Sequence, residues 1–192
     1  GQNWERAAFI KARPVIGDTG AAAAFLKGLE PFVWRRSLDY PAILDIQSIK
    51  RQIHVHKTGE GLEAAGANLK LGRGGIREIE FFAQTQQLIL GGRDPALRCA
   101  RTVDALTALA KAGHVTDQVA AELTAAYAEL RTLEHRVQML ADEQTHSLPE
   151  DVERRRAVAA LAGEGDLAGF DAGVERLLTA VNARYGELFE GE

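Results

Sequence analysis

The run from Lys70 to Phe81, K-L-G-R-G-G-I-R-E-I-E-F, holds the residues of this chain whose types and spacing best suit chemistry. Glycines and basic residues alternate there in a short loop that is expected to open directly into a helix. A helix N-terminus offers unpaired N–H groups and a partial positive charge, and both favour an anion such as phosphate. Glycine lets the backbone approach such a ligand closely. The run therefore predicts an anion-binding loop.

Two kinds of donor are available in this loop. Arginine and lysine side chains suit phosphate oxygens, arginine through two parallel N–H groups. The backbone N–H groups of Gly74, Gly75 and Ile76 are expected to face the same ligand. The candidates for binding phosphate or a nucleotide are Lys70, Gly72, Arg73, Gly74, Gly75 and Arg77.

A structural interpretation of the same loop remains open. The glycines would then only make a tight entry into the helix, and Arg77 would pair with Glu80 one turn on. The run matches neither the P-loop pattern nor the dinucleotide-binding fingerprint, and no strand is expected before it. A polar stripe follows on the helix at Arg77, Glu80, Gln84 and Gln87, and it is either a solvated face or a seam toward a neighbouring domain.

The sequence predicts no metal site and no catalytic residue. Glu78 and Glu80 are two apart, so in a helix they point to different sides and do not share one ion easily. None of the histidines has a partner at ligand spacing. Cys99 lies in a helical pattern without a histidine nearby, which favours a packing role. The residues expected to touch a neighbouring domain are Glu78, Glu80, Arg35 and Arg36, although the two arginines near Asp39 also suit an ion-pair cluster.

Composition excludes several classes of function. The net charge of −4 argues against a general nucleic-acid or membrane-surface binder. The single cysteine rules out an internal disulfide and fits a reducing cytoplasm. No apolar run reaches the ~18 residues that a membrane span needs, and there is no signal peptide. We therefore expect a cytoplasmic protein.

The elements that position the loop are expected to be helices throughout. Alanine is abundant, prolines number only 5, and no segment alternates with period 2. The long loop over 57–75 is the main interruption. Helices are predicted over 4–11, 20–34, from 39 or 40 onward, 76–90, from Asp94 to Gly113, from Thr116 to 143, 150–161 and after Gly165. The fold prediction is an all-α bundle of about seven or eight helices with one long Gly-rich loop, in which 164–192 form a C-terminal helix that completes the bundle.

Six ordered segments resemble one enzyme family, the bacterial glutamine synthetase adenylyltransferases. The likeness extends from Trp4 to about Gly163, and the final helix is a weaker match. The segments are W-E-R-A-A-F-I-K-A-R-P from Trp4, P-F-V-W-R-R-S-L-D-Y from Pro31, the run from Lys70, Q-L-I-L-G-G-R from Gln87, L-R-T-L-E-H-R-V-Q from Leu130 and D-E-Q-T-H-S-L-P from Asp142.

The resemblance implies one part of a bifunctional enzyme. One half of such an enzyme adenylylates a tyrosine of glutamine synthetase, and the other half removes AMP by phosphorolysis. The segment from Pro31 resembles the removing half. The family's Mg²⁺-binding acids lie in a G-S-x-x-D-x-D motif and before an L-R-P run, and neither occurs here. Asp18, Asp39, Asp45 and Asp94 stand in other contexts.

Residues 1–163 are accordingly expected to be the helical domain that follows a nucleotidyltransferase core. The absence of an initiator methionine also leads us to expect a fragment, inactive when alone. For the whole enzyme the resemblance implies Mg²⁺ and ATP or ADP as cofactors, and glutamine synthetase, the PII signal protein, phosphate and glutamine as partners. Two alternatives remain: a non-catalytic module that docks PII or glutamine synthetase, and the helical domain of a PII uridylyltransferase.

Overall fold

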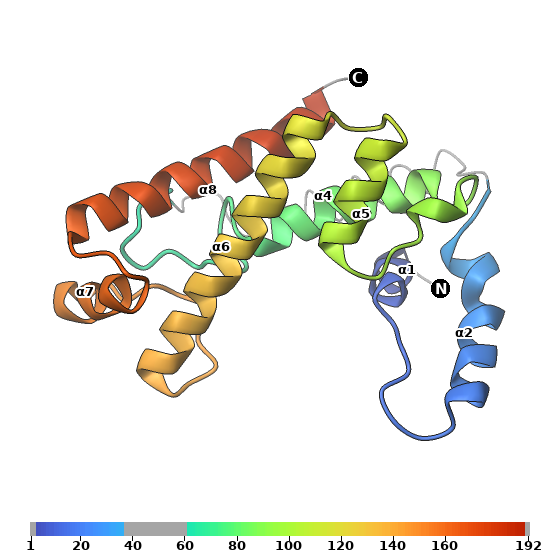
Figure 1. Cartoon of the computed structure of the whole chain (residues 1–192), viewed down its shortest axis with the longest axis horizontal. Coiled ribbons are helices and arrows are strands. Elements are labelled where there is room, and N and C mark those ends of the chain that lie inside the picture. The colour runs from blue at the N-terminus through green and yellow to red at the C-terminus, as the bar shows by residue number, and fades with distance from the viewer. Residues whose placement is uncertain (1–2, 37–60, 191–192) are drawn as a thin grey trace. The chain divides into compact units, whose positions relative to one another are not determined.

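The structure is a computed structural model that describes residues 3–36 and 61–190. The helix predicted from 39 or 40 onward, Asp39, Asp45, His54 and His56 lie outside the described residues. Within the described ranges the chain forms helices and no strand, so the all-α prediction is confirmed (Figure 1). The elements are α1 (Asn3–Ile10), α2 (Thr19–Val33), α4 (Ile76–Leu90), the short 3₁₀ helix η1 (Pro95–Leu97), α5 (Thr102–Lys111), α6 (Asp117–Ala141), α7 (Val152–Leu161) and α8 (Leu167–Glu190).

The chain divides into two compact units. One unit comprises 1–56 and 83–120, and the other comprises 57–82 and 121–192. The predicted boundary at 163/164 does not coincide with this division and stays a prediction. We refer below to the first and second unit.

The first unit is built on the packing of α1 and α2. Its core gathers Ala7, Ile10, Val33 and Leu88, all buried. Partly buried aromatic side chains close around this core, with the Phe9 and Phe32 rings edge to face at 6.4 Å. Full burial of an isoleucine, valine or leucine side chain contributes about 1.5–3 kcal/mol to the free energy of unfolding.

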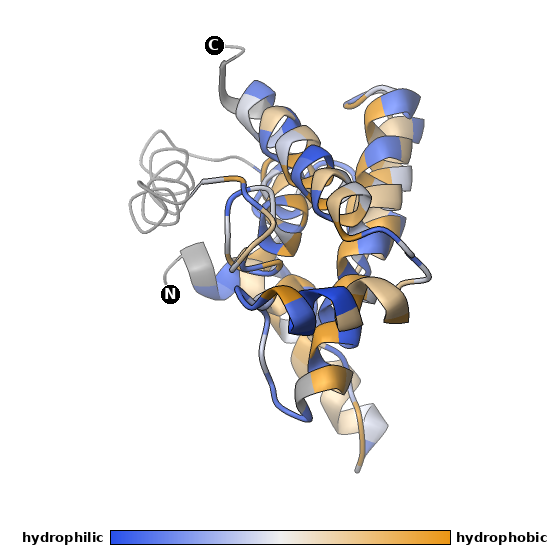
Figure 2. Cartoon of the chain, turned by 90° about the vertical axis from the view of Figure 1, so that its left-hand side faces the viewer, coloured by the Kyte–Doolittle hydropathy of each residue, from blue (hydrophilic) through white to orange (hydrophobic). Residues whose placement is uncertain are grey.

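The second unit holds most of α6 together with α7 and α8. One stripe of α6, which includes Leu130 and Val137, is buried. Figure 2 shows orange and blue residues mixed along the helices, as expected for helices that bury one stripe each. Arg184 of α8 pairs with Glu122 of α6 at 2.8 Å, and Arg155 of α7 pairs with Asp171 of α8 at 2.9 Å.

Local sequence signals explain most helix boundaries. Asp18 caps α2 by accepting the Ala21 N–H at 2.9 Å. Thr116, where a helix was predicted to begin, caps α6 by accepting the Val119 N–H at 3.2 Å.

The single helix predicted from Asp94 to Gly113 is wrong, because η1 and α5 are separate. The side-chain amide of Gln87 donates to the carbonyls of Leu97 and Cys99 at 2.6 and 2.8 Å. These two carbonyls therefore bond a side chain of α4 instead of backbone N–H groups of one continuous helix.

Candidate functional site

The glycine-rich loop lies in the second unit and is organised by Asn68. The Asn68 side-chain oxygen accepts the N–H groups of Lys70 and Leu71 at 3.1 and 2.8 Å. The Asn68 carbonyl accepts the Gly72 N–H at 2.8 Å. Asparagine commonly holds a turn in this way, by bonding the backbone two or three residues on.

The start of the loop is also tied to the segment after α6. Leu69 donates its N–H to the His146 carbonyl, and Leu148 donates to the Ala67 carbonyl, each at 2.9 Å. These bonds flank an isolated antiparallel bridge between Asn68 and Ser147. The loop is therefore fixed against a neighbouring segment although it contains no helix or strand of its own.

Two glycines are required by this geometry. A Cβ atom on Gly72 would lie 2.4 Å from the Asn68 carbonyl oxygen. Gly74 has φ +71°, and a Cβ atom there would lie 1.9 Å from the Leu178 carbonyl oxygen on α8. Both distances are too short for any side chain, so the loop accepts only glycine at these positions.

The backbone N–H groups of the loop are already bonded within it. Gly74 donates to the Glu78 carboxylate and Gly75 donates to the Gly72 carbonyl, both at 3.0 Å. Ile76 donates to the Leu69 carbonyl at 2.9 Å. In this structure a residue of the helix's own first turn and two loop carbonyls accept these three N–H groups. That Gly74 and Gly75 bind a phosphate stays a prediction.

Two of the three basic side chains are paired with carboxylates. Lys70 Nζ lies 3.4 Å from Glu134 Oε1, and Arg77 Nη1 lies 2.9 Å from Glu80 Oε2. The Arg77 guanidinium also lies over the Phe81 ring, 5.6 Å from its centroid. The structural interpretation of Arg77 and Glu80 as an ion pair is confirmed.

Arg73 differs from its two basic neighbours. Its Nε atom is buried and has no hydrogen-bond partner among the described residues. A buried donor without a partner costs free energy, and a charged one costs more. Arg73 lines a cavity of about 550 Å³, together with residues of the loop, Ser147 and α8. The other lining residues are Gly61, Glu63, Ala65, Gly66, Ala67, Asn68, Gly72 and Leu178.

Sequence reasoning missed Glu134, which lies at the centre of the charged groups beside the loop. Its side chain is 1% exposed. It pairs with Lys70 and Arg131, and His146 Nδ1 lies 2.9 Å from Glu134 Oε1. The Arg131–Glu134 spacing of three in a helix was a signal that could have identified one of these pairs.

Glu78 and Glu80, proposed from sequence as domain contacts, are both buried, with 1% and 9% of their surfaces exposed. Burial, and next the negative charge of Glu78, raise the pKa of the Tyr185 hydroxyl well above its usual value. A contact of Glu78 or Glu80 with another domain stays a prediction. Of the polar stripe on α4, Gln84 and Gln87 are buried as well, so the solvated-face interpretation is wrong for these residues.

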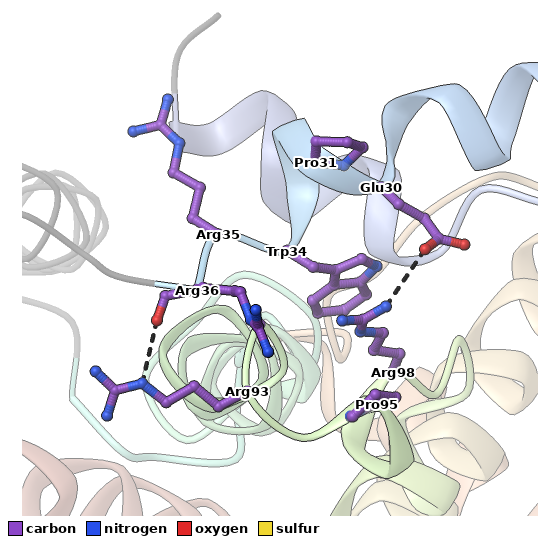
Figure 3. Close-up of a pocket in the computed structure, with 9 residues that line it drawn as sticks. Glu30, Pro31, Trp34, Arg35, Arg36, Arg93, Pro95 and Arg98 are labelled. Atoms are coloured by element: carbon purple, nitrogen blue, oxygen red, sulfur yellow. Dashed lines mark hydrogen bonds and ion pairs between the residues drawn. The ribbon is translucent and has the colours of Figure 1, made fainter.

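The first unit carries a second polar feature, a pocket of about 650 Å³ between the end of α2 and the segment after α4 (Figure 3). Arginines and two prolines dominate its walls. The lining residues are Glu30, Pro31, Trp34, Arg35, Arg36, Gly92, Arg93, Pro95 and Arg98. Arg35 and Arg36 are exposed there, and their role as a domain contact stays a prediction.

The described residues bring no three His, Cys, Asp or Glu side chains together as a metal cluster. Asp18 and Asp94, which sequence reasoning set apart from catalytic acids, serve as caps of α2 and η1.

Burial, and next the charge of Asp104, raise the pKa of the Cys99 thiol. A raised pKa lowers the thiolate fraction. Cys99 is partly exposed and lies between η1 and α5, so its predicted place in a helix is wrong, and its packing role stays a prediction. Among the described residues, no helix is long and apolar enough to cross a membrane.

A family model described as GlnD PII-uridylyltransferase matches residues 47–189. That range includes the glycine loop and continues nearly to the end of α8. The chain belongs to this family. The match covers well over half of the chain.

Relatives match over the entire chain. The chain is 67% identical over 192 residues to the bifunctional glutamine synthetase adenylyltransferase/adenylyl-removing enzyme of Caulobacter vibrioides, covering 100% of the chain and 20% of that enzyme. The enzyme of the same name from Rhizobium meliloti is 57% identical over 192 residues, which cover 100% of the chain and 20% of that enzyme. The enzyme of the same name from Mesorhizobium japonicum is 55% identical over 190 residues, which cover 99% of the chain and 19% of that enzyme. The chain thus spans about a fifth of the length of these relatives.

These matches confirm the predicted resemblance to glutamine synthetase adenylyltransferases and the prediction that the chain corresponds to one part of such an enzyme. The description of the family model names the PII uridylyltransferases, the alternative that sequence reasoning kept open. The three relatives named above carry the adenylyltransferase name.

Proposed function

We propose that this chain is a helical domain of a cytoplasmic enzyme that adenylylates glutamine synthetase and removes the adenylyl group again. The observation that carries the proposal is the 67% identity over all 192 residues to a bifunctional enzyme of that name. The segment from Pro31, P-F-V-W-R-R-S-L-D-Y, supports assignment to the half that removes AMP with phosphate as the attacking group.

In this proposal Mg²⁺ and the nucleotide are held mainly outside the chain. Nucleotidyl transfer needs metal-held phosphates and an in-line attack, and carboxylates usually hold the ions. Because the described residues gather no such carboxylates, we assign them no metal. Glutamine, PII and glutamine synthetase would act on the whole enzyme.

The chain's own contribution would come from Arg73. Lys70 and Arg77 are held by Glu134 and Glu80, which leaves them to shape the loop. The Arg73 guanidinium keeps a buried donor without a partner and lines a polar cavity. A phosphate oxygen would supply that partner. Arg73 would then bind phosphate or ADP through its side chain, while the glycines only let the loop pack.

A domain exchange tests the proposed function. This chain would replace the corresponding region of the Caulobacter enzyme, and adenylylation of glutamine synthetase and removal of AMP would both be assayed. We expect the exchanged enzyme to carry out both reactions, and the 192-residue chain alone to carry out neither. A folded exchanged enzyme that lost both activities would contradict the proposal.

A second assay tests the site. The chain would be titrated calorimetrically with inorganic phosphate and with Mg·ADP, before and after Arg73→Gln. Arg154→Gln is the matched control, because Arg154 is an exposed arginine of the same unit. We expect Arg73→Gln to remove a binding event that the control keeps. Identical titrations of both variants would assign the loop a structural role only.

A further inference from the structure

The pocket at the end of α2 carries positive charge that the described residues do not neutralise. Of the four arginines that line it, Arg98 pairs with Glu30 at 3.4 Å. Arg35, Arg36 and Arg93 have no carboxylate within ion-pair distance in the described part of the chain. Three guanidinium groups that the described residues leave without a carboxylate therefore meet at one pocket, in a chain whose net charge is −4.

The framework of this pocket is fixed by close packing. A Cβ atom on Gly92 would lie 1.9 Å from the Arg35 carbonyl oxygen, so only glycine lets the end of α2 pass at this distance. A Cβ atom on Gly91 would lie 2.8 Å from the Trp34 ring. The Arg93 Nε–H donates to the Arg36 carbonyl at 3.1 Å, which joins the two walls.

Arg98 has a structural role in one wall. Its Nε–H donates to the Gly91 carbonyl at 2.8 Å, and its guanidinium lies 5.7 Å from the centroid of the Trp34 ring. Figure 3 shows this guanidinium beside the indole, with a dashed line from it to the Glu30 carboxylate. The contacts of Arg98 are thus used within the protein, and its charge is compensated.

Among the described residues, no carboxylate pairs with the other three arginines, Arg35, Arg36 and Arg93. Figure 3 shows the Arg36 guanidinium between the Trp34 ring and Arg93, while Arg35 extends outward from the same turn. The Arg36 side chain has no hydrogen-bond partner among the described residues, and the only bond of the Arg93 side chain is the one to the Arg36 carbonyl. The planar guanidinium fork suits phosphate oxygens, which it binds through two N–H groups at once.

The walls also suggest the size and nature of the ligand. The volume of about 650 Å³ falls within the range of about 300–1,000 Å³ that small-molecule pockets occupy. Pro31, Trp34 and Pro95 add apolar surface beside the arginines. We propose that this pocket binds a small phosphorylated molecule, of the size of a nucleoside diphosphate, with Arg36 and Arg93 on its phosphates and Arg35 at the rim. This site is separate in the sequence from the Arg73 cavity and does not depend on the proposed function.

Trp34 provides a local readout of binding. The chain has two tryptophans, so Trp4→Phe leaves Trp34 as the remaining one. Its fluorescence would be followed during titration with inorganic phosphate, with ADP and with polyglutamate, after circular dichroism has shown that helix content is kept. If Trp4→Phe loses helix content, calorimetry on the Arg73→Gln chain with both tryptophans replaces the fluorescence, so that the Arg73 cavity does not contribute to the heat of binding.

We expect saturable binding of ADP, weaker binding of inorganic phosphate, and no saturable binding of polyglutamate. Arg36→Gln and Arg93→Gln should each weaken ADP binding about tenfold, the loss of one charge-assisted contact. Arg101→Gln is the matched control, since its side chain is 80% exposed and lies 3.8 Å from Asp104, outside the pocket. Arg73→Gln should also leave this signal unchanged, which separates the two sites.

Three results would overturn the proposal. One is the absence of saturable binding of either phosphate compound. Another is equal ADP affinity in the chain, Arg36→Gln and Arg93→Gln. The third is saturation by polyglutamate alone, which would make the pocket a docking site for an acidic protein segment.

Discussion

The backbone of Gly74 lies directly against the carbonyl of Leu178, with room for no atom beyond its own hydrogens. This contact joins the glycine-rich loop to the middle of α8 within the second unit. The loop therefore takes its shape from a helix about a hundred residues away in sequence. The Gly74 N–H donates to the Glu78 carboxylate at 3.0 Å, so the loop is also bonded to the first turn of α4.

Gly74→Ala should destabilise the chain by more than backbone strain alone. The added methyl would meet the Leu178 carbonyl oxygen at 1.9 Å, and φ +71° disfavours any L side chain. We expect a loss of about 3 kcal/mol or more in the free energy of unfolding, measured by urea denaturation. Gly163→Ala is the control, because Gly163 has φ +89° with nothing within 4 Å, and it should cost only about 1 kcal/mol. Equal losses would show that the contact is not tight.

Glu134→Gln should weaken the second unit. The substitution keeps the shape of a side chain that is 1% exposed but removes the charge that Lys70 and Arg131 face. The Lys70 and Arg131 side chains are about a third exposed, so solvent weakens their attraction to Glu134. We expect the free energy of unfolding to fall by about 1–3 kcal/mol.

The control for this substitution is Glu153→Gln. Glu153 pairs with Arg156 at 3.0 Å but is 75% exposed, so its change should stay within about 0.5 kcal/mol. Thermal or urea unfolding of the two variants measures the difference. A Glu134 variant as stable as the Glu153 variant would mean that the charges around Glu134 contribute nothing net.

Because the pKa of Tyr185 is raised in the folded chain, we expect the free energy of unfolding to fall at alkaline pH. Burial raises the pKa of its hydroxyl in the folded chain above the unfolded value of 10.0, so the unfolded chain releases this proton first. The stability that Tyr185 contributes is complete below pH 10.0 and falls as pH rises further, with a slope that approaches ~1.4 kcal/mol per pH unit.

Tyr185→Phe isolates this contribution. Urea unfolding of the chain and of the variant would be compared from neutral pH to above pH 10.0. We expect the variant to lose less stability over the alkaline part of the range. Parallel curves would show that Tyr185 titrates alike in the folded and unfolded chain.

Local signals in the sequence were sufficient for most of the fold. The start of α6 at Thr116 was predictable from residues close in sequence, and the structure has Thr116 as the cap of that helix. The break between η1 and α5 was not predictable in this way. It depends on Gln87, whose amide reaches the Leu97 and Cys99 carbonyls from another helix.

In the candidate site, too, the contacts between residues close in sequence were predictable and those between distant segments were not. The sequence identified the basic loop and the Arg77–Glu80 pair, because both are local. It could not show that Glu134 holds Lys70 or that Leu178 closes on Gly74, since these contacts join distant segments. For the same reason it left Arg73 undistinguished from its basic neighbours.

The most direct measurement is the ratio of AMP removal to adenylylation in the Caulobacter enzyme carrying this chain with Arg73→Gln. Losing one contact of arginine to phosphate should lower this ratio about 10–100-fold, while Arg154→Gln leaves it unchanged. An unchanged ratio in Arg73→Gln, with both reactions active, would contradict a role for Arg73 in phosphate-dependent removal of AMP.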